Sequence, residues 1–148
     1  MNAQMKAAEV TEELEQLAGG DDDDIVPRAR ELTERWTLAG VGIEAAEPVL
    51  RFMESHPSID FGSPGPLVHF VERLDRPAYV QCLIASLARK PTSLTAWMLN
   101  RAINAATDAT TRRALVEAMQ LACRHPAADA GALVAINGFL HYQRKGEG

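Results

Sequence analysis

The chain has 148 residues, of which 47% are hydrophobic and 24% charged, and this composition is typical of a folded globular protein, not of a disordered one. At this length we expect a single domain over residues 1–148. No apolar run approaches the roughly 18 residues of a membrane span, and Met1–Gln4 does not open a signal peptide. We therefore expect a cytoplasmic protein that makes no membrane contact.

The net charge of −5 is unevenly distributed. Residues 1–24 hold one Lys and eight Asp or Glu, which gives −7, whereas the remaining 124 residues hold 14 Lys and Arg against 12 Asp and Glu, which gives +2. An acidic segment attracts basic partners and repels nucleic acid and anionic membranes. The same charges also suit a solvated helix face followed by a polar connector, and both interpretations stay open.

Alanine and leucine dominate, and their spacing predicts helices almost throughout. The first helix should run over 3–18 and end at Gly19-Gly20, with Asp21 to Asp24 as an acidic connector. A second should begin near Pro27 and end near Leu38, and a third should cover 43–55, with Pro48 early enough to cause a modest kink at most. His56-Pro57 should end the third helix, because the residue before proline is pushed out of the α region.

An irregular stretch over 58–66 separates these helices from the next group. One apolar face of the fourth helix should consist of Leu67, Phe70, Val71 and Leu74, and one face of the fifth of Val80, Leu83, Ile84 and Leu87. The sixth, over about 93–106, is apolar on several sides and should be central. Asp108 should cap the seventh, whose stripe is Leu115, Val116, Met119 and Cys123, and His125-Pro126 should end it.

The last segment supports two interpretations. Residues 132–136 and 139–142 flank Asn137-Gly138, which is a strong signal for a β-hairpin. A lone two-stranded hairpin is marginal in water, however, and nothing else in the chain indicates a sheet. We therefore predict an eighth helix, in which Gly138 costs about 1 kcal/mol.

These elements predict an all-α fold of seven or eight short helices. Because the breaks in the second half are short, successive helices should pack as antiparallel pairs. The result is either a small HEAT-like α-solenoid or an irregular helical bundle. An acidic N-terminal helix and connector, residues 1–24, should precede the main body.

We find no motif of an enzyme, a metal site or a cofactor site. The zinc-protease, di-iron, P-loop, dinucleotide and nucleophile-elbow patterns are all absent from the sequence. Cys82 and Cys123 lie far apart in apolar helical patterns and should be buried thiols. His56 and His125 each precede a proline at a helix end, where a donor side chain complements the helix dipole. We therefore expect no catalytic residue, no metal and no cofactor.

His69 and the loop before it are the strongest exceptions. His69 could pair with Glu72 at i, i+3, as a general base oriented by a carboxylate, with Ser63 as the one nearby nucleophile. The structural interpretation, a partly buried histidine that ties a helix to its neighbour, is favoured. In the loop, Pro64 and Pro66 remove backbone donors that a phosphate cradle needs, so Ser63 should instead be a helix N-cap.

The second half also lacks a nucleic-acid signature. Its arginines form no basic stripe with interleaved aromatic residues, and aromatic residues are only 5% of the chain. Trp97, Asn100 and Arg101 are favoured as core and local hydrogen bonding, because a buried tryptophan or asparagine needs a partner. We therefore expect no nucleic-acid partner.

Two stretches together resemble a known family. They are Gly62-Ser63-Pro64-Gly65-Pro66-Leu67-Val68-His69-Phe70-Val71-Glu72 and Ser86-Leu87-Ala88-Arg89-Lys90-Pro91-Thr92, the latter continuing through Thr95-Ala96-Trp97-Met98-Leu99-Asn100-Arg101. In this order they resemble small helical immunity proteins of bacterial polymorphic toxin systems, of the contact-dependent growth-inhibition and Rhs types. The resemblance covers residues 43–125.

The resemblance implies an inhibitor without enzymatic activity that binds one toxin domain and blocks its active site or substrate entry. Such toxins are frequently nucleases with basic surfaces, and the acidic segment would then steer association. Gly62, Ser63, Pro64, His69, Glu72, Trp97, Asn100 and Arg101 would be scaffold. Partner contacts would come from exposed acidic residues, namely Glu12, Glu15, Asp21, Asp22, Asp23, Asp24 and Asp60.

A second hypothesis is a helical-repeat adaptor or regulatory protein that binds a peptide or a protein in its groove. It predicts salt-tolerant contacts through an apolar surface, whereas the immunity hypothesis predicts charge-dependent association.

Overall fold

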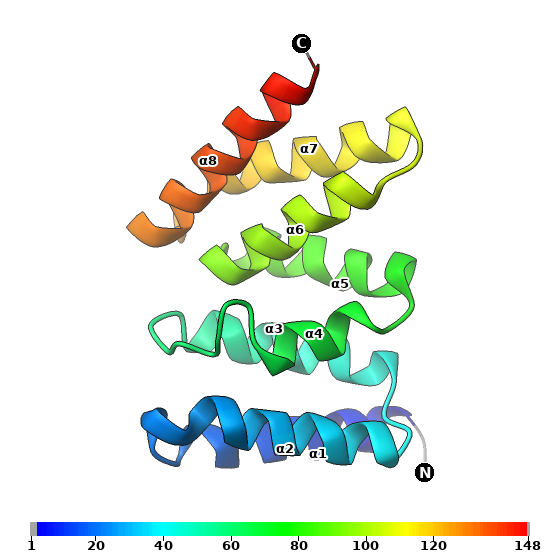
Figure 1. The fold of residues 1–148 in the computed structure, drawn as a ribbon, viewed down its shortest axis with the longest axis vertical. Coiled ribbons are helices and arrows are strands. Elements are labelled where there is room, and N and C mark those ends of the chain that lie inside the picture. Colours follow the sequence, from blue (N-terminus) through cyan, green and yellow to red (C-terminus); the bar gives the residue numbers. More distant parts are fainter. Residues whose placement is uncertain (1–2, 148) are drawn as a thin grey trace. The chain divides into compact units, whose positions relative to one another are not determined.

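The computed structural model describes the backbone of residues 3–147 and the side chains of residues 7–145. Over this range the chain forms α-helices joined by turns and loops, and no strand is present among the described residues (Figure 1). The predicted all-α class is confirmed. The α-helices are α1 (Ala3–Ala18), α2 (Ile25–Leu38), α3 (Ala46–Ser55), α4 (Pro66–Glu72), α5 (Arg76–Arg89), α6 (Ser93–Ala105), α7 (Ala109–Cys123) and α8 (Ala130–Glu147).

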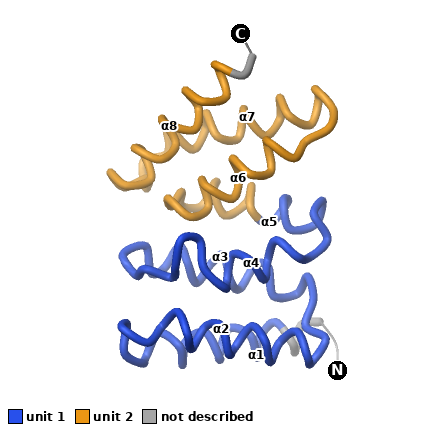
Figure 2. The backbone as a smooth tube through the Cα atoms, in the orientation of Figure 1, with its two compact units in different colours: residues 1–82 blue, residues 83–148 orange. Residues whose placement is uncertain are grey.

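The chain divides into two compact units, Met1–Cys82 and Leu83–Gly148, which we call the N-terminal and C-terminal units (Figure 2). The division falls within α5. The N-terminal unit has 7 Lys and Arg against 16 Asp and Glu, a net charge of −9, and the C-terminal unit has 8 against 4, a net charge of +4. The acidic excess therefore belongs to the whole N-terminal unit and is not confined to residues 1–24.

Helix α1 is an integral part of the N-terminal unit. Its predicted apolar stripe is confirmed, because Val10, Leu14 and Leu17 are at most 4% exposed. The helix contacts α2 and α3, so its exposed acidic residues, Glu9, Glu12 and Glu15, stand on the outer face of a packed element. Burying one large aliphatic side chain contributes about 2 kcal/mol, so three such residues hold α1 firmly in place.

Aromatic side chains connect the other helices of this unit. The Trp36 ring of α2 meets the Phe70 ring of α4 edge-on, with centroids 5.3 Å apart. The Trp36 Nε1–H is buried and has no acceptor among the described residues, so apolar packing alone holds the indole. Phe61, in the loop that precedes α4, packs 5.4 Å from Phe52 of α3 and anchors that loop to the core.

Short 3₁₀ turns shift two predicted boundaries. The expected connector at 21–24 contains a 3₁₀ turn, Asp22–Asp24, and α2 follows it directly at Ile25. The expected helix over 43–55 begins with a 3₁₀ turn, Ile43–Ala45, and becomes α-helical at Ala46. Pro48 lies in the first turn of α3, where a backbone N–H would have no intrahelical acceptor, so it removes no helical hydrogen bond.

The loop between α3 and α4 depends on two glycines. Gly62 and Gly65 have φ values of +116° and +96°, and a Cβ on Gly65 would lie 1.9 Å from the Phe61 carbonyl oxygen. The peptide bond between Ser63 and Pro64 is cis. The prediction that Ser63 caps the following helix is wrong: Gly65 occupies the N-cap position, without a side-chain hydrogen bond, and Pro66 opens α4.

The C-terminal unit is organised around α6, which packs against α7 and α8 as a buried central helix should. Thr92 and Thr95 form a reciprocal capping box at its start, and Asp108 caps α7 as predicted. Residues 130–147 are helical, so the hairpin alternative is excluded. Gly138 lies on an open face of α8, where a side chain would contact nothing.

Three burial predictions are wrong. Ile84, expected to face the core, is 38% exposed, and α5 instead buries Tyr79, Leu83, Ser86 and Leu87. Cys82 and Cys123, expected as buried thiols, are both half-buried. His69, expected to be partly buried, is exposed. Among the described residues, none of the helices is long and apolar enough to cross a membrane.

Candidate protein-binding surface

Six of the seven acidic residues expected to contact a partner lie on α1, on the 3₁₀ turn that follows it, or at the N-cap of that turn. Glu12, Glu15 and the aspartates Asp21 to Asp24 are all exposed. Asp21 also has a structural role, because its Oδ1 accepts a hydrogen bond from the Asp23 backbone N–H at 3.0 Å. Asp22 and Asp23 carry their charge within a tight 3₁₀ turn, and this places several carboxylates in one short segment.

Two other acidic residues differ from this group. Glu13, on the inner side of α1, is only part-exposed and lies 3.2 Å from Arg35 of α2, so its charge is partly neutralised. Asp60, the seventh predicted contact residue, lies on the loop between α3 and α4. Its Oδ1 accepts a hydrogen bond from the Gly62 N–H at 3.0 Å, which stabilises the loop, although the side chain remains exposed.

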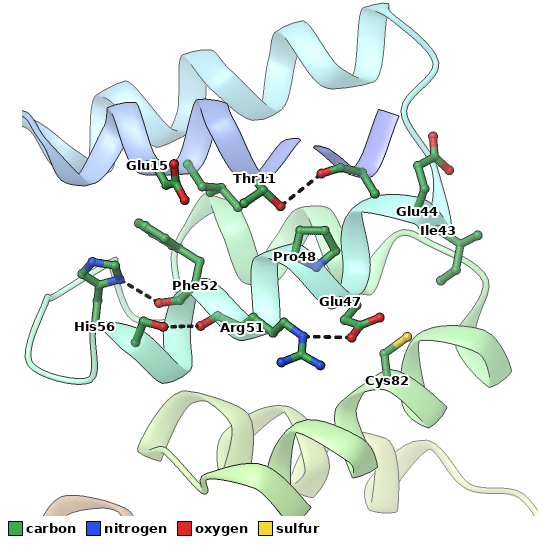
Figure 3. A pocket seen from close by; sticks show the side chains of 13 residues that line it. Thr11, Glu15, Ile43, Glu44, Glu47, Pro48, Arg51, Phe52, His56 and Cys82 are labelled. Atoms are coloured by element: carbon green, nitrogen blue, oxygen red, sulfur yellow. Dashed lines mark hydrogen bonds and ion pairs between the residues drawn. The ribbon is translucent and has the colours of Figure 1, made fainter. Parts of the chain in front are cut away.

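A groove of about 620 Å³ opens beside α1, wholly within the N-terminal unit. Figure 3 shows Thr11 and Glu15 on α1 facing Pro48 and Phe52 on α3. Cys82 of α5 completes the lining. Glu15 is the one predicted contact residue that lines this groove. Sequence patterns gave no signal for the cavity, because its lining residues lie up to 75 positions apart, from Ala7 to Cys82.

Most polar groups around the groove are held by local contacts. Glu47 pairs with Arg51 one turn along α3, with 2.8 Å between Oε1 and Nε, and Glu44 accepts a hydrogen bond from the Gly42 N–H at 3.0 Å. His56 Nδ1 lies 2.9 Å from the Phe52 carbonyl oxygen, so Nδ1 carries a proton and donates to it. The prediction that His56 complements a helix C-terminus is confirmed.

A second cavity, of about 740 Å³, is lined by residues of α2, of α4 and of the loop between α3 and α4. Gly62, Ser63 and His69 line it, together with Arg30 and Arg73. Pro64 and Glu72, which belong to the same sequence motif, are not among its lining residues. The loop thus positions its side chains at a surface between α2 and α4, while its glycines fix the backbone.

The other motif residues, Trp97, Asn100 and Arg101, lie in the C-terminal unit, where Asn100 contacts a buried amide that the sequence did not reveal. Gln143 is 3% exposed, and its Nε2 donates to Asn100 Oδ1 at 2.8 Å and to Asn104 Oδ1 at 2.9 Å. Arg112 Nη2 donates to Gln143 Oε1 at 2.6 Å. Because Arg112 can only donate, it fixes which way the amide of Gln143 points.

Two further side chains of this unit stabilise helix ends and faces. Arg101 stacks over the Trp97 ring, 4.9 Å from its centroid, as a local contact on α6. The prediction that Trp97 and Arg101 belong to the core is wrong, because Trp97 is half-buried and Arg101 is exposed. His125 accepts a hydrogen bond from the Ala127 N–H at Nδ1 and contacts the Ala88 carbonyl oxygen at 2.7 Å through Nε2. That carbonyl belongs to the last turn of α5, so His125 completes a neighbouring helix as well as ending its own.

No group of three or more His, Cys, Asp or Glu residues in the described part of the chain is placed to hold a metal ion.

Comparison with known proteins found no match: no protein-family model, curated protein or solved structure matches this chain.

Proposed function

We propose that this protein is an immunity protein that binds one basic toxin domain and blocks its active site or the entry of its substrate. The observation that carries the proposal is the set of exposed acidic residues on α1 and on the 3₁₀ turn at 22–24, in a unit with a net charge of −9. The sequence resemblance at 62–72 and 86–101 supports the same function.

The chemistry of the partner follows from the charge. Opposite charges across an interface accelerate encounter and reject partners of the same sign. A nuclease domain presents a basic surface to phosphates, and the carboxylates at 21–24 would occupy the positions that phosphates take on that surface. Inhibition then needs no catalytic group on this chain, because an occupied surface excludes the substrate.

The motif residues serve as scaffold in this proposal. Gly62 and Gly65 fix the loop before α4, and Asn100 takes part in the amide network of the C-terminal unit. His69 is exposed and lines the second cavity, together with Ser63. A His69→Ala variant should therefore retain full protective activity, whereas an enzyme with His69 as its base would lose it.

The test is co-expression with the protein encoded immediately upstream, scored first by growth and then by co-purification. We expect growth to be rescued and a one-to-one complex to be recovered. A neighbour that is harmless, or toxic without being bound and neutralised, would contradict the immunity function. In that case the helical adaptor becomes the leading account of the protein.

A further inference from the structure

The groove beside α1 combines an apolar floor with a partly exposed aliphatic edge. Leu14 and Phe52 are 1% and 6% exposed, so their side chains close the bottom of the groove against the core. Ile43, which is 40% exposed, also lines the groove. The volume of about 620 Å³ lies within the roughly 300–1,000 Å³ of cavities that hold a compact ligand or a few side chains.

The rim of this groove is acidic. Glu15, Glu44 and Glu47 line it with one arginine, Arg51, so the charges of these four side chains sum to −2. Glu44 and Glu47 are engaged by Gly42 and Arg51, whereas the Glu15 carboxylate makes no hydrogen bond or ion pair with the described part of the chain. The Glu47–Arg51 pair is more than half exposed on both sides and so is cheap to open.

We infer that this groove binds a segment of the partner in which one large apolar side chain is flanked by lysine or arginine. This inference rests on the proposed function, because it assigns the basic partner a specific point of insertion. The apolar side chain covers Leu14 and Phe52, and a flanking cation meets Glu15. Once the apolar contact excludes water, the attraction between those charges is stronger than in bulk solvent.

Charge also argues against the other occupants. An acidic or anionic ligand would face the rim carboxylates and is repelled by them. An uncharged apolar peptide would bury its side chain but leave Glu15 without a partner at the edge of a desolvated contact, which costs free energy. A basic segment with an apolar anchor satisfies both parts of the groove.

The experiment is selection of a displayed library of random peptides, about 12 residues long, on the intact protein. Peptides that bind are then counter-selected on a Thr11→Trp variant. Thr11 is exposed and lines the groove, so the indole fills the cavity without changing charge. Gln16→Trp is the matched control, because Gln16 is an exposed residue of the same helix and does not line the groove. Circular dichroism establishes that both variants fold.

We expect the recovered peptides to share an apolar residue next to Lys or Arg. Their affinity, measured by fluorescence anisotropy, should fall about tenfold or more in Thr11→Trp and change less than about twofold in Gln16→Trp. Glu15→Gln should weaken binding about threefold to tenfold, and Glu12→Gln, an equal charge change on the same helix outside the groove, should weaken it less.

Three results would overturn the inference: recovery of no peptide, equal binding to Thr11→Trp, or groove-dependent peptides without basic residues. The proposed function is tested separately, by growth on co-expression. An Asp22→Asn, Asp23→Asn variant alters residues that do not line the groove, so it should change peptide affinity by less than about twofold. If no peptide binds the groove as expected but co-expression still rescues growth, the toxin binds another surface of the protein. If peptides bind the groove as expected but co-expression does not rescue growth, the immunity function is wrong, and the groove still binds a basic segment of some other partner.

Discussion

The N-terminal unit carries a net charge of −9 and the C-terminal unit +4. The two units also differ in where their polar side chains lie. In the N-terminal unit the core is apolar and aromatic apart from Thr33 and Glu54, while Glu12 and Glu15 of α1 and the aspartates of the 3₁₀ turn are exposed. In the C-terminal unit a glutamine, Gln143, is buried and holds side chains of α6 and α7.

The exposed carboxylates of the N-terminal unit are therefore accessible to a partner, whereas the polar groups of the Gln143 network are used within the fold. A buried amide with all its partners specifies one arrangement of helices, and its groups are then unavailable to a ligand. The exposed carboxylates of Asp22 and Asp23 contribute little to stability and are free to attract a partner. We therefore propose that a partner binds the N-terminal unit. Substitutions at Gly65, Gln143 and Asp108 test how each unit is stabilised, and a double substitution at Asp22 and Asp23 tests partner binding.

The largest effect is expected from Gly65→Ala, in the loop that anchors α4. At φ +96° a Cβ would overlap the Phe61 carbonyl oxygen, so the backbone must move, and we expect a loss of about 3 kcal/mol or more in the free energy of unfolding. Gly40→Ala is the control, because Gly40 has φ +76° but open space around it, and should lose only about 1 kcal/mol.

The measurement is chemical denaturation followed by tryptophan fluorescence. Each unit has one tryptophan, Trp36 or Trp97, so a Trp97→Phe background reports the N-terminal unit alone. If Gly65→Ala costs no more than Gly40→Ala, the close contact at Phe61 is not what fixes this loop.

The next largest effect should come from Gln143, in the other unit. Gln143→Ala removes hydrogen bonds to Asn100, Asn104 and Arg112 and leaves a cavity, for an expected loss of about 2–3 kcal/mol. Gln143→Met keeps the chain length but loses the hydrogen bonds, and should lose about 1–2 kcal/mol. Denaturation followed by Trp97 fluorescence measures both. A Met variant as stable as the native protein would mean that the network contributes no net stability.

Gln143 also shows where sequence reasoning stops. Helical periodicity located most helices to within a few residues, because apolar spacing and proline or capping residues are local signals. Gln143 was missed because its partners lie 31 to 43 residues away, and nothing local marks a glutamine as buried. The groove beside α1 was missed for the same reason, since Thr11 and Phe52 meet only through tertiary packing.

Burial was less predictable than helix position. Ile84 fits the apolar stripe of α5 as well as Leu87 does, yet it is exposed, while Ser86 is buried. A hydrophobic residue at the edge of a stripe faces whatever tertiary contact is available, and spacing alone does not give that contact. Ser63 was misassigned as a cap because the loop places Gly65 at the N-cap position of α4.

A smaller effect, on association and not on stability, is expected from the acidic turn. An Asp22→Asn, Asp23→Asn variant should slow association with the proposed basic partner about fivefold at low ionic strength, because the electrostatic attraction that steers the two proteins together weakens. The difference should shrink near 0.15 M salt, where the screening length is about 8 Å. Stopped-flow fluorescence of complex formation gives the rate.

The control for this variant is Glu31→Gln, Glu34→Gln, which changes the net charge of the same unit by the same amount. Both residues lie on exposed positions of α2. If the two variants slow association equally, the overall charge of the N-terminal unit matters and the 3₁₀ turn has no special role. If neither slows it, charge does not steer the partner.

The smallest effect concerns pH and the C-terminal unit. Hydrogen bonds from the Thr111 backbone and side chain lower the pKa of Asp108 below its ordinary value of 3.8. Because the folded pKa is the lower one, the ionised cap stabilises the fold at pH values above 3.8, and this contribution is lost as the pH falls through the folded value. Asparagine caps a helix about as well but does not titrate. The advantage of the native protein over Asp108→Asn in thermal denaturation should therefore decrease between neutral pH and pH values below 3.8.

The control for this prediction is Glu117→Gln, which removes a charge from the same helix without touching the cap. A matching pH trend in that variant would show that general charge repulsion, and not the cap, is being measured.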